Sequence, residues 1–135
     1  MSQVGSSYTL SSTTELTFAE AVTRTREELT KEGFGVLCEV DVQATLKQKL
    51  GVDREPYLIL GACNPALAHA ALDAEPELGV LLPCNVIVYQ QQGQTLLAAV
   101  DAEQMLSIVS NDELQSTATE VRRRLGAVVE RVAQG

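Results

Sequence analysis

The sequence contains no tryptophan, and its three tyrosines and two phenylalanines make up only 4% of the chain. Nucleic-acid bases and sugars would therefore find few rings on which to stack. Positive charge is also scarce, because ten lysines and arginines face eighteen aspartates and glutamates, for a net charge of −8. A field of this sign repels phosphate backbones and anionic bilayers, so we expect neither nucleic acid nor a membrane as a partner.

Long hydrophobic runs and targeting signals are missing as well. The longest apolar run, residues 79–89, is interrupted by Pro83 and Asn85 and is too short to span a bilayer. Residues 1–7 hold neither the basic start nor the apolar stretch of a signal peptide. The three cysteines are an odd number with no paired spacing, which suits reduced thiols. We therefore expect a cytoplasmic protein.

Motifs of common catalytic and metal sites are absent from the sequence. There is no Cys-x-x-Cys pair, no phosphate-binding glycine pattern and no pair of carboxylates placed for acid–base work. His69 is the only histidine and has no recognisable serine or cysteine partner, so nothing supports a catalytic triad. The sequence therefore predicts no catalytic residue, no closed metal site and no cofactor, and it favours a protein that is not an enzyme.

What the chain does contain is the composition of an ordinary globular protein. Its 135 residues, 45% of them hydrophobic, are enough for one domain with a real core, so we expect residues 1–135 to form a single domain. Apolar spacing, caps and turns predict the order β-α-β-α-β-α-β-β-α-α. This order favours an α+β fold with a single mixed, largely antiparallel sheet of about five strands and helices mainly on one face.

Local signals place most of these elements. Strands are expected over residues 7–11, 34–40, 57–63, 85–90 and 95–100. Helices are expected after the capping residues Thr17, Asp41, Asn64 and Asp101, and after a capping box at residues 110–113. The near-continuous apolar run at 57–63 suits a strand covered on both faces or nearly so. Cys38 lies on the apolar face of its strand, so we expect it in the core.

The most informative feature is a Cys-Asn pair that occurs twice, as Cys63-Asn64 and Cys84-Asn85, each at one end of an apolar strand. Cys63 directly precedes a helix start, where the helix dipole favours a thiolate, so it is a candidate reactive thiol or soft-metal ligand. The alternative is a buried core cysteine, because free cysteine is often buried. Asn64 is explained as a helix cap, whereas Asn85 has no obvious structural role. If the two strands are antiparallel neighbours, both thiols lie at the same end of the sheet; if they are parallel, the thiols lie at opposite ends.

Several segments resemble the family called domain of unknown function 302. These are Gly33-Phe34, residues 39–42, Gly61-Ala62-Cys63-Asn64-Pro65 and Leu81-Leu82-Pro83-Cys84-Asn85-Val86. The resemblance extends from about Thr17 to the last helix. It implies a small α+β protein that forms a homodimer and has no assigned activity. It also implies an association with sulfur-transfer domains, and it supplies no catalytic residues.

Three hypotheses of function follow. The first is a non-enzymatic homodimer that binds a small ligand, a sulfur species or a soft metal near Cys63 and Cys84, with Asn64 and Asn85 as further candidate ligand-binding residues. The second is a purely structural or interaction module, with the cysteines in its core and a dimer face on the hairpin 86–100 or on the last helix. The third is an enzyme whose residues come together only in space.

Overall fold

The computed structural model describes residues 7–135 and contains five strands and five α-helices. The strands are β1 (Thr9–Thr14), β2 (Gly35–Asp41), β3 (Tyr57–Cys63), β4 (Cys84–Gln91) and β5 (Gln94–Val100). The helices are α1 (Phe18–Lys31), α2 (Val42–Leu50), α3 (Pro65–Ala74), α4 (Ala102–Leu106) and α5 (Gln115–Gln134). Three short 3-10 segments are η1 (Pro76–Leu81), η2 (Ser107–Val109) and η3 (Asp112–Leu114).

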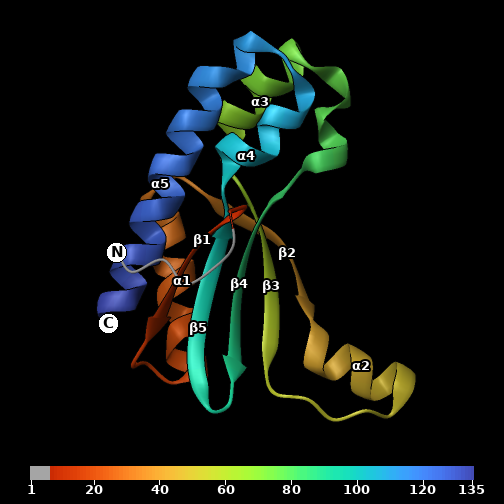
Figure 1. Ribbon diagram of the computed structural model, residues 1–135, viewed down its shortest axis with the longest axis vertical. Helices are drawn as coiled ribbons and strands as arrows, with labels where there is room; N and C mark the ends of the chain where they lie inside the picture. Colours follow the sequence, from red (N-terminus) through yellow and green to blue (C-terminus); the bar gives the residue numbers. More distant parts are fainter. Residues whose placement is uncertain (1–6) are drawn as a thin grey trace.

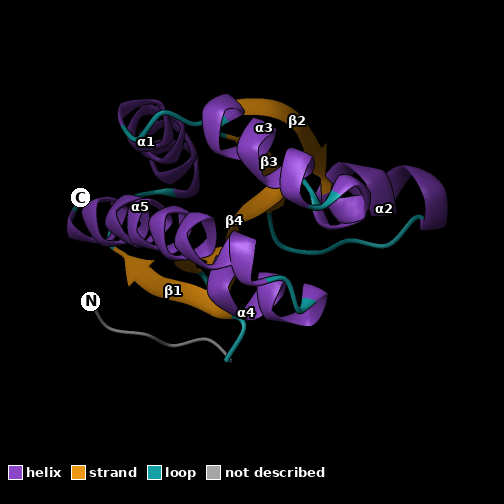
Figure 2. Cartoon of the chain, turned by 90° about the horizontal axis from the view of Figure 1, so that it is seen from above, coloured by secondary structure: helices purple, strands orange, loops and turns teal. Residues whose placement is uncertain are grey.

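The five strands form one sheet in the order β1-β5-β4-β3-β2, and every pairing in it is antiparallel. Helices α1 and α5 lie side by side against one face of this sheet (Figures 1 and 2). The predicted α+β class, the order of elements and the placement of helices mainly on one face are confirmed. None of the helices in residues 7–135 combines the length and the apolar character needed to cross a bilayer.

The main core lies between the sheet and helices α1 and α5. Its largest fully buried side chains come from the inward positions of the strands and from the helices: Leu10, Leu29, Val86, Val88, Leu97, Leu125, Val128, Val129 and Val132. The buried residues of α5 are spaced three and four apart and face this core. Helix α1 begins at the predicted capping box, in which Thr17 Oγ1 accepts from the Glu20 N–H and Glu20 Oε1 accepts from the Thr17 N–H.

A second, smaller cluster lies beyond one end of the sheet. It joins α3, η1, α4 and the beginning of α5 through the buried side chains of Ala71, Leu78, Leu106, Leu114 and Ala118. These elements form the upper part of the molecule in Figure 1. We call them the cap, meaning residues 65–81 and 102–118. The cap meets the sheet at the end where β3 stops and β4 begins.

The edge strand β2 differs from the prediction, whereas helix α2 forms where it was predicted but is exposed. A β-bulge between Val36 and Cys38 shifts the register of β2 against β3, so the simple alternation expected for this strand is broken. Cys38 is exposed, and its predicted place in the core is wrong. Helix α2 begins at Asp41 and ends at Gly51 as expected, but none of its nine residues is buried.

Smaller differences concern the ends of elements. Strand β1 ends at Thr14, three residues after the end expected at residue 11. Thr14 Oγ1 donates to the carbonyl of Val132 and holds this end of the strand against α5. The capping box expected at residues 110–113 is wrong. Ser110 instead has a left-handed backbone, and Asn111 caps the short η3 by accepting from the Glu113 N–H.

Candidate functional site

The antiparallel pairing of β3 and β4 decides where the two Cys-Asn pairs lie. Cys84 is opposite Ala62, so it lies next to Cys63 at the same end of the sheet. Cys63 is the last residue of β3 and Cys84 is the first residue of β4. The structure thus settles the question that the sequence left open, in favour of neighbouring antiparallel strands.

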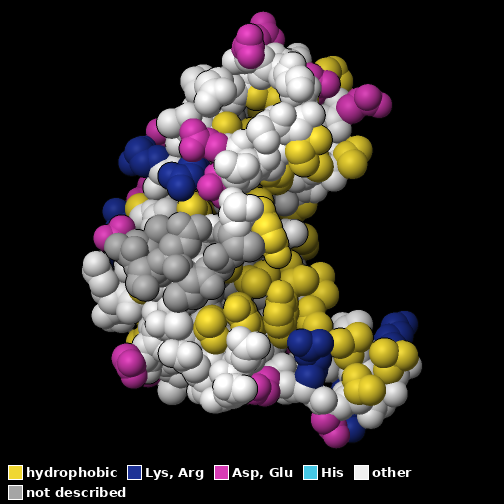
Figure 3. Space-filling model, viewed as in Figure 1, with side chains coloured by type: hydrophobic (Ala, Val, Ile, Leu, Met, Phe, Trp, Pro, Cys, Tyr) yellow, Lys and Arg dark blue, Asp and Glu magenta, His cyan; other side chains and the backbone are white. Residues whose placement is uncertain are grey.

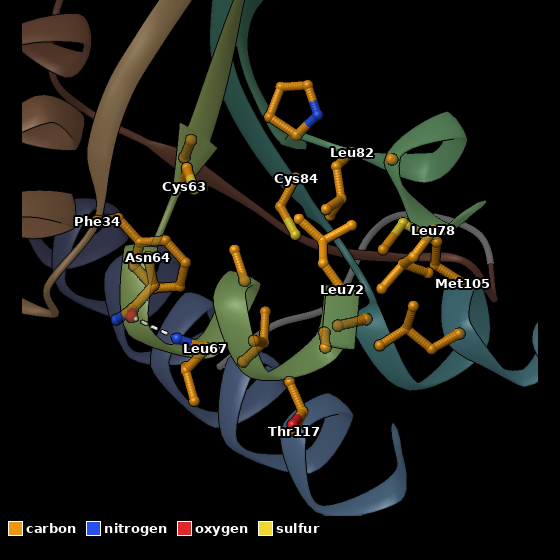
Figure 4. Close-up of a pocket in the computed structure, with 18 of the residues that line it drawn as sticks. Phe34, Cys63, Asn64, Leu67, Leu72, Leu78, Leu82, Cys84, Met105 and Thr117 are labelled. Carbon is orange, nitrogen blue, oxygen red and sulfur yellow. Dashed lines mark hydrogen bonds between the residues drawn. The ribbon is translucent and has the colours of Figure 1, made fainter. Parts of the chain in front are cut away.

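Both cysteines line a cavity of about 330 Å³ between the end of the sheet and the cap. Its walls are Phe34 and Leu37, the ends of β3 and β4, the inner sides of α3, η1 and α4, and the start of α5. Figure 4 shows Cys63 and Cys84 on neighbouring strands, with Leu67 and Met105 contributed by the surrounding helices. No charged residue of the described chain lines this cavity, and Asn64 and Thr117 are its uncharged polar side chains besides the thiols.

Local sequence explains how Asn64 is held beside the cavity. Its side-chain Oδ1 accepts from the Leu67 N–H at 3.2 Å and caps α3, while Pro65 fills the first helical position. Gly33 makes room for this amide, because a Cβ at Gly33 would lie 2.9 Å from Asn64 Nδ2. Asn64 is buried, and its carbonyl oxygen Oδ1 is engaged in the cap. Its amide therefore has a structural role that explains its presence.

The apolar surroundings set the chemistry of Cys84. Burial, together with repulsion from Cys63, raises the pKa of the Cys84 thiol from 9.0 to about 11. Cys84 is therefore a neutral thiol at neutral pH and packs as a small apolar residue with a weak S–H donor. Cys63 is only partly buried, so its sulfur is the more accessible of the two.

Two other residues singled out in the sequence lie outside this cavity. Asn85 is exposed and is paired with Gly61, on the sheet face opposite α1 and α5. His69 is exposed on α3, with its Nε2 3.8 Å from Asp73 Oδ2. In residues 7–135 no group of three or more His, Cys, Asp or Glu side chains is arranged to hold a metal ion.

Several lining residues were not singled out from the sequence. Phe34, Leu72, Leu78 and Met105 come from four separate segments, and each looks like an ordinary core residue when taken alone. The sequence did carry one signal for them. The short helices on either side of Pro76 are rich in apolar residues, but each buries only one of them, so apolar side chains are left over to line a cavity. Their convergence on one cavity depends on how the cap packs on the sheet.

Comparison with other proteins places the chain in a family. Residues 8–132 match the family described as "Domain of unknown function DUF302". A crystal structure of an uncharacterized conserved DUF302 protein from Bacillus stearothermophilus has a similar fold, with a TM-score of 0.88 and 30% sequence identity over 94% of this chain and 99% of that chain. No curated protein matches the chain. The chain therefore belongs to the DUF302 family of domains of unknown function.

Proposed function

We propose that this protein is a non-enzymatic, homodimeric module that binds a small apolar ligand in the cavity beside Cys63 and Cys84. The observation that carries the proposal is the cavity of about 330 Å³ whose walls hold no charged side chain. Ligand pockets are typically concave, mostly apolar and supplied with a few polar groups that orient the ligand. Thr117 and the thiol of Cys63 are the polar groups available for that purpose.

The size of the cavity limits the ligand. An apolar cavity of ~150 Å³ holds one benzene molecule with room to spare, so a cavity of about 330 Å³ suits a ligand of two or three rings, or a short acyl chain. A highly charged ligand would lose its hydration without gaining an ionic partner. We therefore expect a neutral ligand, or one whose charged group stays in solvent.

Binding of a neutral fluorescent dye tests this proposal. N-phenylnaphthylamine is apolar and becomes fluorescent when it leaves water, so titration with the dye measures occupancy of the cavity. Ala68→Leu adds a larger side chain to the cavity wall, and we expect it to weaken dye binding by about tenfold or more. Ala70→Leu is the matched control, because Ala70 lies on the same helix, is exposed and does not line the cavity.

Two results would contradict the proposal. One is the absence of dye binding by the native protein at micromolar concentrations. The other is an equal effect of the two leucine substitutions while circular dichroism shows both variants folded. Either result would leave the cavity without a role in binding.

A more specific version of this proposal is that the two cysteines hold a sulfur species or a soft metal ion. The neighbouring positions of Cys63 and Cys84 support it, because two thiolates are soft ligands. The raised pKa of Cys84 opposes it, because a thiol must lose its proton to bind a metal. Thiol titration of Cys63→Ser and Cys84→Ser, with intact mass and metal analysis of the native protein, decides the matter. Unreactive thiols without bound metal or extra sulfur would eliminate this form.

The second candidate function is an interaction module in which the cysteines are core residues. It is favoured by the burial of Cys84 and by the apolar side chains on the sheet face opposite α1 and α5, most of which are only half-buried. It predicts no dye binding in the cavity but a stable self-association. The two candidate functions therefore differ in the outcome of the dye titration.

A further inference from the structure

Helix α2 and the loop after it project from the sheet as an arm, which we define as residues 42–54. In Figure 1 this arm lies beyond the end of β2, away from the cap and from α1 and α5. Its main contacts are with β2 and β3. An isolated helix of nine residues is marginal in water, yet this one has both ends capped, by Asp41 and by the left-handed Gly51. The caps therefore fix where the helix begins and ends, but none of its side chains is buried against the rest of the described chain.

The arm and the adjoining strand expose an unusual amount of apolar surface. Three of the eight exposed large hydrophobic residues in residues 7–135 lie on the arm or at the adjoining end of β2, namely Val40, Leu50 and Val52. A fourth, Leu37, lies toward the other end of β2 and lines the cavity. Leu50 is 69% exposed. Of these residues only Leu50 lies on α2, where Val42 and Leu46 are half-buried. An apolar helix face normally packs against another surface, and the rest of the described chain leaves Leu50 largely uncovered.

A second apolar surface lies on the sheet face opposite α1 and α5. One row of side chains crosses four strands there, because Val40 pairs with Ile59, Ile59 with Ile87 and Ile87 with Ala98. The next row contains Tyr57, Tyr89 and Leu96. An antiparallel sheet with one solvated face normally alternates apolar and polar residues, whereas β3 and β4 are apolar on both faces. The larger side chains of these rows are half-buried or exposed, and Ala98 is buried. Figure 3 shows hydrophobic side chains gathered in a hollow between the cap and the arm. We call this surface the outer face.

The distribution of charge indicates which partner would cover the arm and the outer face. The arm holds three of the ten basic residues, Lys47, Lys49 and Arg54, and only one of the eighteen acidic residues, Asp53. It therefore carries a net charge of +2, and the rest of the chain carries −10. An arm that is apolar and basic suits a surface that is apolar within an acidic molecule, and a second copy of this chain supplies such a surface.

We propose that two copies of the chain form a dimer in which the arm of each copy packs on the outer face of the other. The arrangement is isologous, because one two-fold axis relates both arm-to-face contacts. It fills the hollow of each protomer and covers the apolar sides of β3 and β4. This inference deepens the homodimer part of the proposed function and does not depend on ligand binding in the cavity.

Sedimentation of single variants is the first test. We expect the native protein to be a dimer at micromolar concentration, and Leu50→Asp to raise the dissociation constant by about tenfold or more. Val80→Asp is the matched control, because Val80 is 87% exposed but lies in η1, outside both surfaces. A monomeric native protein, or equal behaviour of the two variants, would overturn the proposal.

Mixing two dimerisation-deficient variants tests the geometry. Ile87→Lys places a positive charge on the outer face, where the basic arm would lie, and we expect it to weaken the dimer too. In a mixture of Leu50→Asp and Ile87→Lys chains, the intact arm of one variant meets the intact outer face of the other. Association should therefore return in the mixture, whereas arm-to-arm or face-to-face packing would leave it no stronger than in the separate variants. Failure of this rescue would refute the arm-to-face arrangement.

Two further measurements keep the interpretation clear. Circular dichroism and thermal unfolding of each variant establish that it is folded, and Ile87→Gln replaces Ile87→Lys if the charge prevents folding. Titration with N-phenylnaphthylamine on the same samples separates the two proposals. Dye binding by a monomeric variant would uphold the cavity while the dimer is lost, and a dimer without dye binding would uphold the arm while the cavity proposal fails.

Discussion

The buried thiol of Cys84 makes the stability of this protein depend on pH in a predictable direction. Its pKa is raised from 9.0 to about 11 in the folded protein, first by burial and second by repulsion from Cys63. In the unfolded chain the thiol regains its ordinary pKa and loses its proton about two pH units earlier. Since the unfolded state then binds fewer protons than the folded state, stability falls as pH rises between these two values.

The size of the effect follows from the shift. One pKa unit corresponds to about 1.4 kcal/mol, so the Cys84 thiol should remove about 2–3 kcal/mol of folding free energy as the pH rises from 9.0 to about 11. Well below pH 9.0 the thiol is neutral in both states and the difference vanishes. Other groups also titrate in this range, so the informative quantity is the difference in stability between the native protein and Cys84→Ala.

Urea unfolding followed by circular dichroism measures that difference. The experiment is run with a non-thiol reducing agent at several pH values from about 8 to about 11. The difference in ultraviolet absorbance between the native protein and Cys84→Ala separates the thiolate of Cys84 from the other two cysteines and from the ionised tyrosines. We expect the advantage of the native protein over Cys84→Ala to shrink steadily over this range. A constant difference, or a thiolate signal from Cys84 near pH 9.0, would show that the site is open to water and refute the reasoning.

Two other predictions concern the backbone around the sheet. A Cβ at Gly61 would lie 2.6 Å from Cys38 Sγ and 2.8 Å from Pro83 Cγ, so Gly61→Ala should lower stability in urea unfolding by about 1–2 kcal/mol after the entropic gain of alanine. Adding Cys38→Ala should restore part of this loss, and a neutral Gly61→Ala would contradict the clash. The carboxylate of Glu55 accepts two turn N–H groups, that of Gly93 foremost, which lower its pKa below 4.5. The native protein should therefore lose its stability advantage over Glu55→Gln as pH falls below 4.5, and an advantage independent of pH would count against this hydrogen bonding.

The exposure of helix α2 is the feature of the structure that the sequence indicated least. Asp41, Gly51 and the spacing of Val42, Leu46 and Leu50 were enough to predict the helix, because caps and periodicity act within a few residues. An apolar stripe on a helix normally faces a partner surface, yet none of these residues is buried in the described chain. An apolar stripe indicates that a helix packs against another surface, but it does not identify that surface. The partner surface lies elsewhere in the sequence or on another chain.

The cavity shows a second limit of prediction from sequence, which concerns how strands pair. Its two cysteines were singled out from their places at strand ends, but their approach depended on whether β3 and β4 pair antiparallel. Cys38 illustrates the same limit in reverse, because a bulge in β2 turned an expected core position into an exposed one. Strand partners and bulges arise from contacts between distant residues, so local alternation alone does not determine them.

By itself, the sequence determined the elements of this protein, its α+β class, the caps of α1, α2 and α3 and the absence of recognisable catalytic motifs. These features depend on neighbouring residues and on composition, and both are present in the linear chain. The tertiary structure alone decided that Cys63 and Cys84 share an apolar cavity, that Asn85 lies apart from it, and that the arm extends from the edge of the sheet. The physical reason is that strand register and the packing of the cap bring together segments up to about ninety residues apart, and burial of the whole molecule selects that arrangement.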